Sequence, residues 1–298
     1  MNKTAFIVHG RRSIAQPFKR TFQKNSRSIE GEYAVFITSE RGHGKSLATE
    51  LAHDGYTHVI AVGGDGTLHE VVNGIIISDN PNCVVGLLPA GTANDYAKNF
   101  TLEKKLAPLI HNLNAKTSTK VNLGKITLSD NTAEYFINIA DMGLGVDVVQ
   151  RVNRSKKLLG SNLTFTKAIL ESFFHFKNQE VNVKTSDWSW EGRINSLVVA
   201  NGKYFGSGMC IAPEADIQGD NFAVVIIGDV SMRDYLNHIG KIKRGQKIDH
   251  PEIYYHRANF LEINSAHGIE ADGEYLGNNP TSIRLIPKKL NFLANQPL

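Results

Sequence analysis

Residues 58–67 read HVIAVGGDGT and residues 84–95 read VVGLLPAGTAND, and these two stretches decide the fold. Each begins with an apolar run that is typical of a buried strand in a parallel sheet. A glycine-containing turn follows, and then comes a segment with helix-forming signals. Both turns are therefore predicted at strand-to-helix junctions, where backbone N–H groups without partners can face an anion. Together the two stretches predict a site for nucleotide phosphates.

The first turn has the features of a phosphate-binding loop. Its glycines permit a backbone path and a close ligand approach that a Cβ would obstruct; they are Gly63, Gly64 and Gly66. Thr67 and Glu70 have the spacing of a capping box, so a helix is expected to open here. Asp65 is unusual, because a carboxylate beside a phosphate is repelled unless a cation lies between them or the carboxylate only holds loop N–H groups. We favour Mg²⁺ held largely through water.

The second turn repeats this design. Pro89 and Gly91 form the turn, and Thr92 and Asp95 have the spacing of a helix N-cap. Thr92 can offer both its hydroxyl and its backbone N–H to a phosphate oxygen. Isolated glycine turns are common in any α/β protein, so either turn alone says little. The two turns in this order are far more specific.

Further motifs along nearly the whole chain keep the order found in one known family. They are Thr38 with Gly42-His43, Gly63–Thr67, Asn73-Gly74, Pro89–Asp95, Phe136–Ala140, Asn201-Gly202, Gly206–Met209, Ala212-Pro213 and Asp272-Gly273-Glu274. This series resembles the catalytic domain of the diacylglycerol kinase family, in particular the soluble bacterial lipid kinases, which also resemble sphingosine and ceramide kinases. The resemblance implies ATP and Mg²⁺ as cofactors and transfer of the γ-phosphate to a lipid hydroxyl, with a diacylglycerol-type substrate favoured.

The resemblance also implies roles for particular residues. The expected nucleotide-binding residues are Gly63, Gly64, Gly66, Thr67, Gly91, Thr92, Asn94, Thr38 and His9. Asp65 and Asp95 are the expected metal-binding residues, and the expected catalytic residues are Asp65, Asp272, Glu274 and Lys167. Asp272 or Glu274 is assigned the proton-accepting role, since in a strand-like segment both side chains project to the same side. The alternative for these two residues is an ordinary Asp-Gly hairpin turn.

The pattern of elements changes once along the chain. Up to about Val121, strands and helices alternate, which predicts a doubly wound parallel sheet with ligands at the carboxyl ends of its strands. Closely spaced strands, the first over 135–140, then predict an antiparallel β-sandwich-like domain, interrupted by one helix over about 163–176. We expect an ATP-binding α/β domain over 1–121 and a β-rich lipid-substrate domain over 122–286. The resemblance implies that about 287–298 return to the first domain.

Composition fits two globular domains and favours the cytoplasm. With 298 residues and 41% hydrophobic content, the chain can build two cores. Two cysteines, Cys83 and Cys210, offer no disulfide framework, which favours a reducing compartment. No stretch approaches the roughly 20 apolar residues that span a bilayer. A lipid kinase of this kind is therefore expected to visit the membrane from solution.

Local charge indicates more about partners than the net charge of +4. Two clusters of basic residues stand out. The first consists of Arg151, Arg154, Lys156 and Lys157, and the second consists of Lys241, Lys243, Arg244 and Lys247. Anionic lipid surfaces attract such clusters, so transient membrane-surface contact and peripheral association are expected, although a solvated face is the plainer interpretation. Nucleic-acid binding is not expected, because there is no recognition module or basic-aromatic array. The sequence leaves a homodimer open.

Departures from the family pattern keep two other functions in view. Where the family has Asn-Pro after its first strand, this chain has His9-Gly10. His69 stands in place of the family's Asn before the Glu that follows the glycine loop, and Asn122 stands in place of an Asp two residues before the Gly of the crossover strand. These changes motivate a nucleotide-binding regulator or lipid carrier that has lost catalysis. A kinase for a soluble substrate such as NAD would share the Gly-Gly-Asp-Gly-Thr loop, but the tract after Pro89 argues against it. The particular lipid is not identified, because apolar pockets discriminate tails weakly.

Overall fold

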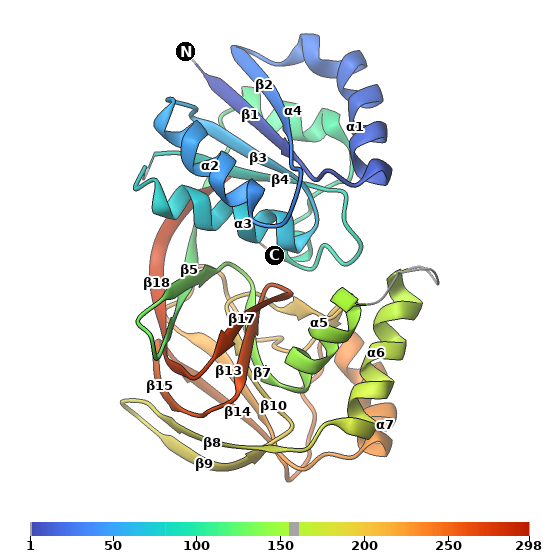
Figure 1. Ribbon diagram of the computed structural model, residues 1–298, viewed down its shortest axis with the longest axis vertical. Helices are drawn as coiled ribbons and strands as arrows, with labels where there is room; N and C mark the ends of the chain where they lie inside the picture. The colour runs from blue at the N-terminus through green and yellow to red at the C-terminus, as the bar shows by residue number, and fades with distance from the viewer. Residues whose placement is uncertain (1, 81, 155–160, 298) are drawn as a thin grey trace. The chain divides into compact units, whose positions relative to one another are not determined.

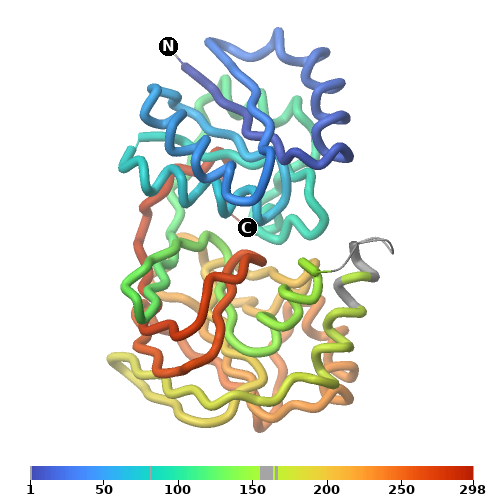
Figure 2. The backbone as a smooth tube through the Cα atoms, in the orientation of Figure 1, coloured from blue at the N-terminus to red at the C-terminus, as the bar shows by residue number. Residues whose placement is uncertain are grey.

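The computed structural model describes residues 2–80, 82–154 and 161–297 (Figure 1). The chain divides into two compact units: unit 1 comprises Met1–Asn122 and Lys288–Leu298, and unit 2 comprises Leu123–Pro287. Figure 2 traces the red C-terminal end of the chain back into the unit that the blue N-terminal residues form. Because the chain passes between the units twice, the N-terminal unit is discontinuous in sequence.

Unit 1 is a parallel sheet with helices on both faces. Its strands run in the order β2-β1-β3-β4, and the end of β18 follows β4 in parallel. The elements are β1 (Lys3–Val8), α1 (Arg12–Asn25), η1 (Ser26–Ser28), β2 (Glu32–Ile37), α2 (His43–His53), β3 (His58–Gly63), α3 (Asp65–Ile77), β4 (Val84–Pro89), η2 (Tyr96–Asn99) and α4 (Leu106–Asn114). All four strands end at the same edge of the sheet, since they are parallel.

Burial on both faces of this sheet explains its apolar strands. Phe6 and Ile60 pack with apolar residues of α1 and α4 in one core cluster. The intervening residues Ile7 and Ala61 are also fully buried, as expected when helices cover the opposite face. Helices α2 and α3 pack against each other beside β1 and β3 (Figure 1).

Unit 2 is built from antiparallel strands. One sheet has the order β14-β13-β10-β7-β16-β17, and other strands follow the order β18-β15-β8-β9, with β5 paired to β18 and β6 paired to β5. Its elements are β5 (Thr119–Leu128), β6 (Ala133–Phe136), β7 (Ile139–Gly143), α5 (Leu144–Arg154), α6 (Ser161–His175), β8 (Gln179–Lys184), β9 (Ser189–Ile194), β10 (Ser196–Ala200), β11 (Tyr204–Phe205), β12 (Met209–Cys210), β13 (Phe222–Ile227), α7 (Met232–Lys243), β14 (Ile253–Ala258), β15 (Phe260–Asn264), β16 (Gly268–Ala271), β17 (Glu274–Asn278) and β18 (Pro280–Phe292).

The core of unit 2 lies between strands of the two sets. Met142 and Val199 from the first sheet share one cluster with Val183 and Leu261 from the second. Two sets of strands with a shared apolar core have the architecture of a β-sandwich. The predicted fold class, a parallel α/β unit followed by an antiparallel β-rich unit, is therefore confirmed.

The details of unit 2 differ from the sequence prediction. The expected strand over 135–140 is two strands, β6 and β7, which are separated at Ile137 and Asn138. The N–H groups of these two residues donate to the carboxylate of Asp272 instead of continuing a ladder. Strands β9, β16 and β17 and helices α5 and α7 were not anticipated, whereas the expected helix appears as α6. Among the described residues, no helix has the length and apolar character that crossing a bilayer requires.

Candidate functional site

The first glycine loop lies between β3 and α3. Helix α3 begins at Asp65, and Gly64 at its N-cap position contributes no side-chain cap. The predicted capping box of Thr67 and Glu70 is therefore wrong. Thr67 instead packs its side chain against Gly63, where an added Cβ would clash with it. A helix end without a side-chain cap leaves its first backbone N–H groups for a ligand or water.

The second glycine loop packs directly on the first. The N–H groups of Ala90 and Gly91 both donate to the carbonyl oxygen of Gly63, at 2.8 and 3.0 Å. A Cβ on Gly91 would overlap the backbone of Gly64, and a Cβ on Gly64 would lie 3.2 Å from the Cα of Gly91. The two loops thus meet backbone to backbone, which only glycine at both positions allows without displacement.

Within the second loop, Asn94 holds the turn together. Its backbone is left-handed, with φ of 49°. Its side-chain oxygen accepts from Gly91 N at 3.0 Å and its amide donates to Gly91 O at 2.9 Å. Asn tolerates left-handed backbone because its short polar side chain can bond locally. Asn94, expected to bind nucleotide directly, therefore also fixes the loop from within.

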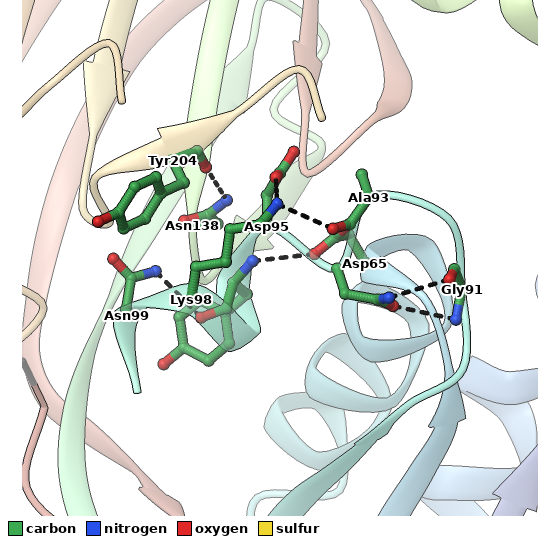
Figure 3. A network of polar contacts seen from close by, with 10 residues as sticks. Asp65, Gly91, Ala93, Asp95, Lys98, Asn99, Asn138 and Tyr204 are labelled. Carbon is green, nitrogen blue, oxygen red and sulfur yellow. Dashed lines mark hydrogen bonds and ion pairs between the residues drawn. The ribbon is translucent and has the colours of Figure 1, made fainter. Parts of the chain in front are cut away.

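The predicted N-cap of Thr92 and Asp95 is also wrong. Tyr96–Asn99 form a short 3₁₀ helix, η2, and Asp95 at its N-cap position makes no capping hydrogen bond. The Asp95 carboxylate instead pairs with the ammonium of Lys98, which also donates to the carbonyl of Ala93 at 2.9 Å (Figure 3). Asp95 is 4% exposed, so this pair neutralises a carboxylate that is nearly removed from water.

Asp65 connects the two loops through its side chain. Its Oδ1 accepts a hydrogen bond from the backbone N–H of Tyr96 at 3.0 Å, and Figure 3 places its carboxylate beside the second loop. One of the two roles considered for Asp65, holding loop N–H groups, is thus present in the structure. An acceptor bond at one oxygen is compatible with metal binding through water, since a carboxylate offers about four lone-pair sites.

The two glycine loops offer few carboxylates that could bind Mg²⁺. Among the residues that the structure describes, no group of three or more His, Cys, Asp or Glu side chains is placed to hold a metal ion. Asp65 and Asp95 are the acidic residues of the loops, and hydrogen bonding and ion pairing already engage both. Mg²⁺ commonly binds through one or two carboxylates, with water and substrate phosphates completing its octahedron, so this donor set fits Mg²⁺ held with a nucleotide.

His9 and Thr38 lie at the same sheet edge as the glycine loops. His9 N donates to Val62 O at 3.0 Å, which places the end of β1 next to the end of β3. Thr38 Oγ1 accepts from Gly10 N at 3.0 Å, so the ends of β1 and β2 are also joined. His9 Nδ1 accepts from Arg11 N at 3.0 Å. The structure therefore brings all the expected nucleotide-binding residues to one edge of unit 1.

Glu70 has a structural role that sequence reasoning missed. Its two carboxylate oxygens accept from Gly42 N at 2.7 Å and Gly44 N at 2.8 Å. A Cβ on Gly44 would clash with the same carboxylate. Glu70 on α3 thereby shapes the turn that opens α2. No local pattern indicated this contact, because Gly42 and Gly44 lie 28 and 26 residues before Glu70 in the chain, and the spacing of Glu70 to Thr67 suggested a cap instead.

In unit 2, Asp272 lies in a tight hairpin turn between β16 and β17. Asp272 and Gly273 both have positive φ, 52° and 85°. The expected strand-like geometry is wrong, because the backbone forms an Asp-Gly turn; the proton-accepting role of Asp272 or Glu274 stays a prediction. Two adjacent residues with positive φ are typical of the hairpin turns that match strand twist.

The Asp272 carboxylate is anchored in the protein. It accepts from the N–H groups of Ile137 at 3.0 Å, Asn138 at 3.0 Å and Ile139 at 3.3 Å, and the residue is 7% exposed. Glu274, the first residue of β17, is half-buried. The two acidic residues thus differ: one is bound to three backbone donors, and the other lies at the start of a strand.

Lys167 lies on α6, another element of unit 2. Its side chain is 63% exposed and its ammonium lies 3.5 Å from Glu171 Oε1, one helical turn away. Such exposed pairs contribute little to stability. Two members of the basic cluster after α5, Lys156 and Lys157, lie outside the described residues.

Comparison with known proteins agrees with both units. Residues 3–126 match the model of the diacylglycerol kinase catalytic domain, and residues 138–294 match the YegS C-terminal NAD kinase beta sandwich-like domain. A diacylglycerol kinase of Staphylococcus haemolyticus is 27% identical over 290 residues, which cover 95% of this chain and 85% of that protein. One from Staphylococcus saprophyticus is 26% identical over 288 residues, covering 94% and 92%.

Solved structures show the same fold. The crystal structure of a diacylglycerol kinase from Bacillus anthracis has a TM-score of 0.71 at 15% identity, covering 99% of this chain and 97% of that one. A further chain from that organism has a TM-score of 0.78 at 17% identity, with the same coverage. The two family matches place the chain in the kinase class. More particularly, the chain belongs to the family of the YegS C-terminal NAD kinase beta sandwich-like domain, which matches more than half of it, and its residues 3–126 carry a diacylglycerol kinase catalytic domain.

Proposed function

We propose that this protein is an ATP-dependent lipid kinase that transfers the γ-phosphate of ATP to a lipid hydroxyl, with a diacylglycerol-type lipid as the favoured substrate. One observation carries the proposal: two glycine loops meet backbone to backbone at the carboxyl edge of a parallel sheet, beside a helix end without a side-chain cap. Nucleotides bind at this edge in α/β sheets. Family membership supports a kinase, and the printed names of its relatives support the lipid.

In this proposal the backbone of unit 1 binds the phosphates. The first-turn N–H groups of α3 and the residues Gly63, Gly64, Gly66, Thr67, Gly91, Thr92 and Asn94 form the cradle, with His9 and Thr38 beside it. A helix N-terminus favours negative charge through its dipole and its unpaired donors. Bound ATP supplies the phosphoryl group, and Mg²⁺ supplies positive charge on its oxygens. Asp65 and Asp95 would hold the metal, largely through water.

Unit 2 supplies the acceptor side of the proposed reaction. Asp272 or Glu274 accepts the proton of the lipid hydroxyl as the new P–O bond forms, and Lys167 adds positive charge near the transferred group. The need for such groups follows from phosphoryl transfer, which is catalysed mainly by positioning and charge stabilisation. We assign lipid binding to 122–286 and ATP binding to 1–121 with 287–298.

A lipid substrate also requires access to a membrane. We propose a cytoplasmic protein that contacts anionic membrane surfaces transiently through basic residues, among them Arg151 and Lys241, both outside the two glycine loops. Each basic residue near such a surface contributes about 1 kcal/mol. A homodimer is compatible with this proposal, and no nucleic acid takes part in it.

The function is tested with purified protein, radiolabelled ATP and three acceptor sets: a total membrane lipid extract, diacylglycerol in mixed micelles, and NAD. Label in a lipid product supports the proposal, and label only in NADP identifies a soluble-substrate kinase. ATP or lipid binding without turnover on any acceptor would identify a regulator or carrier. Mass spectrometry of newly phosphorylated lipids then identifies the acceptor.

Two substitutions at Asp65 separate its proposed roles. Asp65→Asn keeps an oxygen that can accept from Tyr96 N but removes the charge, whereas Asp65→Ala removes both. If the carboxylate orients Mg²⁺, both variants lose phosphoryl transfer by at least about 100-fold, as expected for loss of an electrostatic group. Turnover close to wild type in Asp65→Asn would mean that Asp65 only holds the loop.

A further inference from the structure

Strands β7 and β16 place two carboxyl groups opposite each other. Glu270 and Asp141 are register partners in the antiparallel pair. Their neighbours Met142 and Ala271 face the sandwich core, so the alternation of strand side chains turns both carboxyl groups to the other face of the sheet. Partners of this kind have Cβ atoms about 4.5–5.5 Å apart. Helix α5 covers this face, since a Cβ on Gly145 would clash with Asp141 Oδ2.

Both carboxyl groups are removed from water without a cation. Asp141 is 0% exposed and Glu270 is 3% exposed. Among the described residues, no donor forms a hydrogen bond of normal distance and angle with either oxygen of Asp141, and no cation forms an ion pair with Asp141 or Glu270. Glu270 Oε2 accepts one bond, from Gly273 N at 2.9 Å.

The other charged groups nearby do not neutralise the pair. The adjoining hairpin contributes Asp272 and Glu274, whose negative charges oppose ionisation of Glu270. Helix α5 carries Asp147, Arg151 and Arg154. The guanidinium of Arg151 is engaged with Asp147, its Nε lying 2.6 Å from Oδ2. Tyr275 on β17 lies opposite Glu270 in register and brings no basic group to the pair.

Burial raises the pKa of both acids, and like charge raises that of Glu270 further. Burial raises the pKa of Asp141 well above its ordinary value. The Ser196 hydroxyl and the Gly145 and Met142 N–H groups lie near the carboxyl group without forming bonds of normal geometry, and they lower this pKa only in part. Burial, followed by the charge of Asp141, raises the pKa of Glu270 well above its ordinary value. Two buried acids that face each other without a cation do not both ionise at neutral pH.

We propose that Asp141 and Glu270 share a proton at neutral pH and act as a positioning pair for the turn over 271–274. Glu270 holds Gly273 N, and this bond fixes the turn that carries Asp272 and Glu274. Loss of the shared proton places four carboxylates around one turn, and their repulsion displaces it. The catalytic part of this inference rests on the proposed kinase activity, whereas the sharing of the proton does not.

The stability of the fold provides the first test. Because the folded pKa values lie above the unfolded ones, the contribution of the pair is fully present below about pH 4 and is lost as pH rises towards the folded values. Each proton of difference changes the unfolding equilibrium constant about tenfold per pH unit. Urea denaturation between about pH 5 and pH 8 is expected to show a smaller loss of stability in Asp141→Asn and Glu270→Gln than in the wild type.

A matched control and a local probe complete the test. Glu262→Gln removes a carboxylate from exposed Glu262 on β15, so it is expected to keep the wild-type pH dependence. With glycine-selective ¹⁵N labelling, the Gly273 amide resonance is expected to titrate with a midpoint well above the ordinary range of a carboxyl group. In Glu270→Gln this titration is lost. The wild-type measurement stands even if a variant fails to fold.

Turnover tests the positioning role. The alkaline decline of kcat is expected to move to higher pH in Glu270→Gln, with KM changed less than about twofold and the Glu262→Gln profile unchanged. Equal pH slopes of stability in the wild type and both variants, or a flat Gly273 resonance, would overturn the shared proton. If the alkaline decline of kcat in Glu270→Gln occurs at the same pH as in the wild type, the positioning role is overturned. If neither the wild type nor any variant phosphorylates an acceptor, the positioning role in catalysis fails together with the proposed function. The stability and NMR measurements then still test whether Asp141 and Glu270 share a proton.

Discussion

The glycine loop at Gly63–Thr67 and the turn at Ala271–Glu274 are both short bends that depend on glycine, but they satisfy their backbones differently. In the loop, glycines press two backbones together and the helix end receives no side-chain cap. In the turn, carboxylates of Glu270 and Asp272 accept backbone N–H groups from Gly273 and from residues 137–139. The loop therefore keeps donors for a ligand, whereas the turn uses its acceptors within the protein.

The largest effect is expected where the two loops touch. In Gly91→Ala the new Cβ overlaps the backbone of Gly64, which cannot move aside as a flexible side chain would. We expect a loss of about 3 kcal/mol in the free energy of unfolding, as for severe overpacking. ATP affinity should fall by more than tenfold, because the phosphate cradle is displaced. Urea denaturation and isothermal titration with ATP measure the two quantities.

Gly64→Ala is the graded control for this prediction. Its Cβ would lie 3.2 Å from the Cα of Gly91, a distance that a shift of a few tenths of an ångström relieves. We expect a smaller loss than in Gly91→Ala, in both stability and ATP affinity. Equal effects of the two substitutions, or none, would contradict the backbone contact as the reason for these glycines.

The next largest effect on stability is expected at Asp272, and a clearly smaller one at Glu274 in the same turn. Asp272→Asn replaces a carboxylate that accepts three N–H groups with an amide that has one oxygen, so we expect a loss of about 2–3 kcal/mol in the free energy of unfolding. Glu274→Gln, at the half-buried start of β17, should cost less than about 1 kcal/mol. Urea denaturation of both variants measures this difference.

Turnover of the same two variants identifies the base. If Glu274 accepts the proton, Glu274→Gln loses about 100-fold or more in kcat while its stability is nearly unchanged. If Asp272 is the base, Asp272→Asn loses turnover beyond what its lower stability explains, when it is assayed at a temperature where it is folded. Wild-type kcat in both variants would remove the turn from the proposed mechanism.

A middle-sized effect is expected at Glu70, which links α3 to the turn before α2. Glu70→Ala removes both acceptors of Gly42 N and Gly44 N, and we expect a loss of about 1–2 kcal/mol in the free energy of unfolding. Glu70→Gln keeps one acceptor and should lose roughly half as much. Glu50→Gln on exposed α2 is the control and should match the wild type.

The same comparison explains how far the sequence predicts the molecule. Strand β3 and the loop after it were predictable because an apolar run, three glycines and a helical pattern all indicate one junction. The contact between Gly64 and Gly91 was not, because it joins loops from two strands that only the sheet brings together. Short local patterns also misled, since Thr67 and Glu70 have capping spacing but contact other partners.

The turn at 271–274 shows more clearly what cannot be predicted from the sequence. The series Asp272-Gly273-Glu274 indicated an acidic motif, yet its backbone was expected to be strand-like. Its geometry depends on N–H groups of Ile137, Asn138 and Ile139, which lie more than 130 residues earlier in the chain. The buried Asp141 and Glu270 gave no sequence signal, because only pairing of β7 with β16 makes them neighbours.

The smallest structural effect is expected at Lys167, and this makes it informative about function. Its side chain is exposed, and its ammonium pairs with Glu171 one helical turn away, so Lys167→Ala should change the free energy of unfolding by less than about 0.5 kcal/mol. If Lys167 adds charge near the transferred phosphoryl group, kcat falls by about tenfold or more while the fold is intact. Lys177→Ala, on an exposed lysine beyond α6, serves as the control for general loss of positive charge. Equal turnover of the two variants would show that Lys167 acts only as surface charge, and would leave the donors of the glycine loops as the main source of phosphate stabilisation.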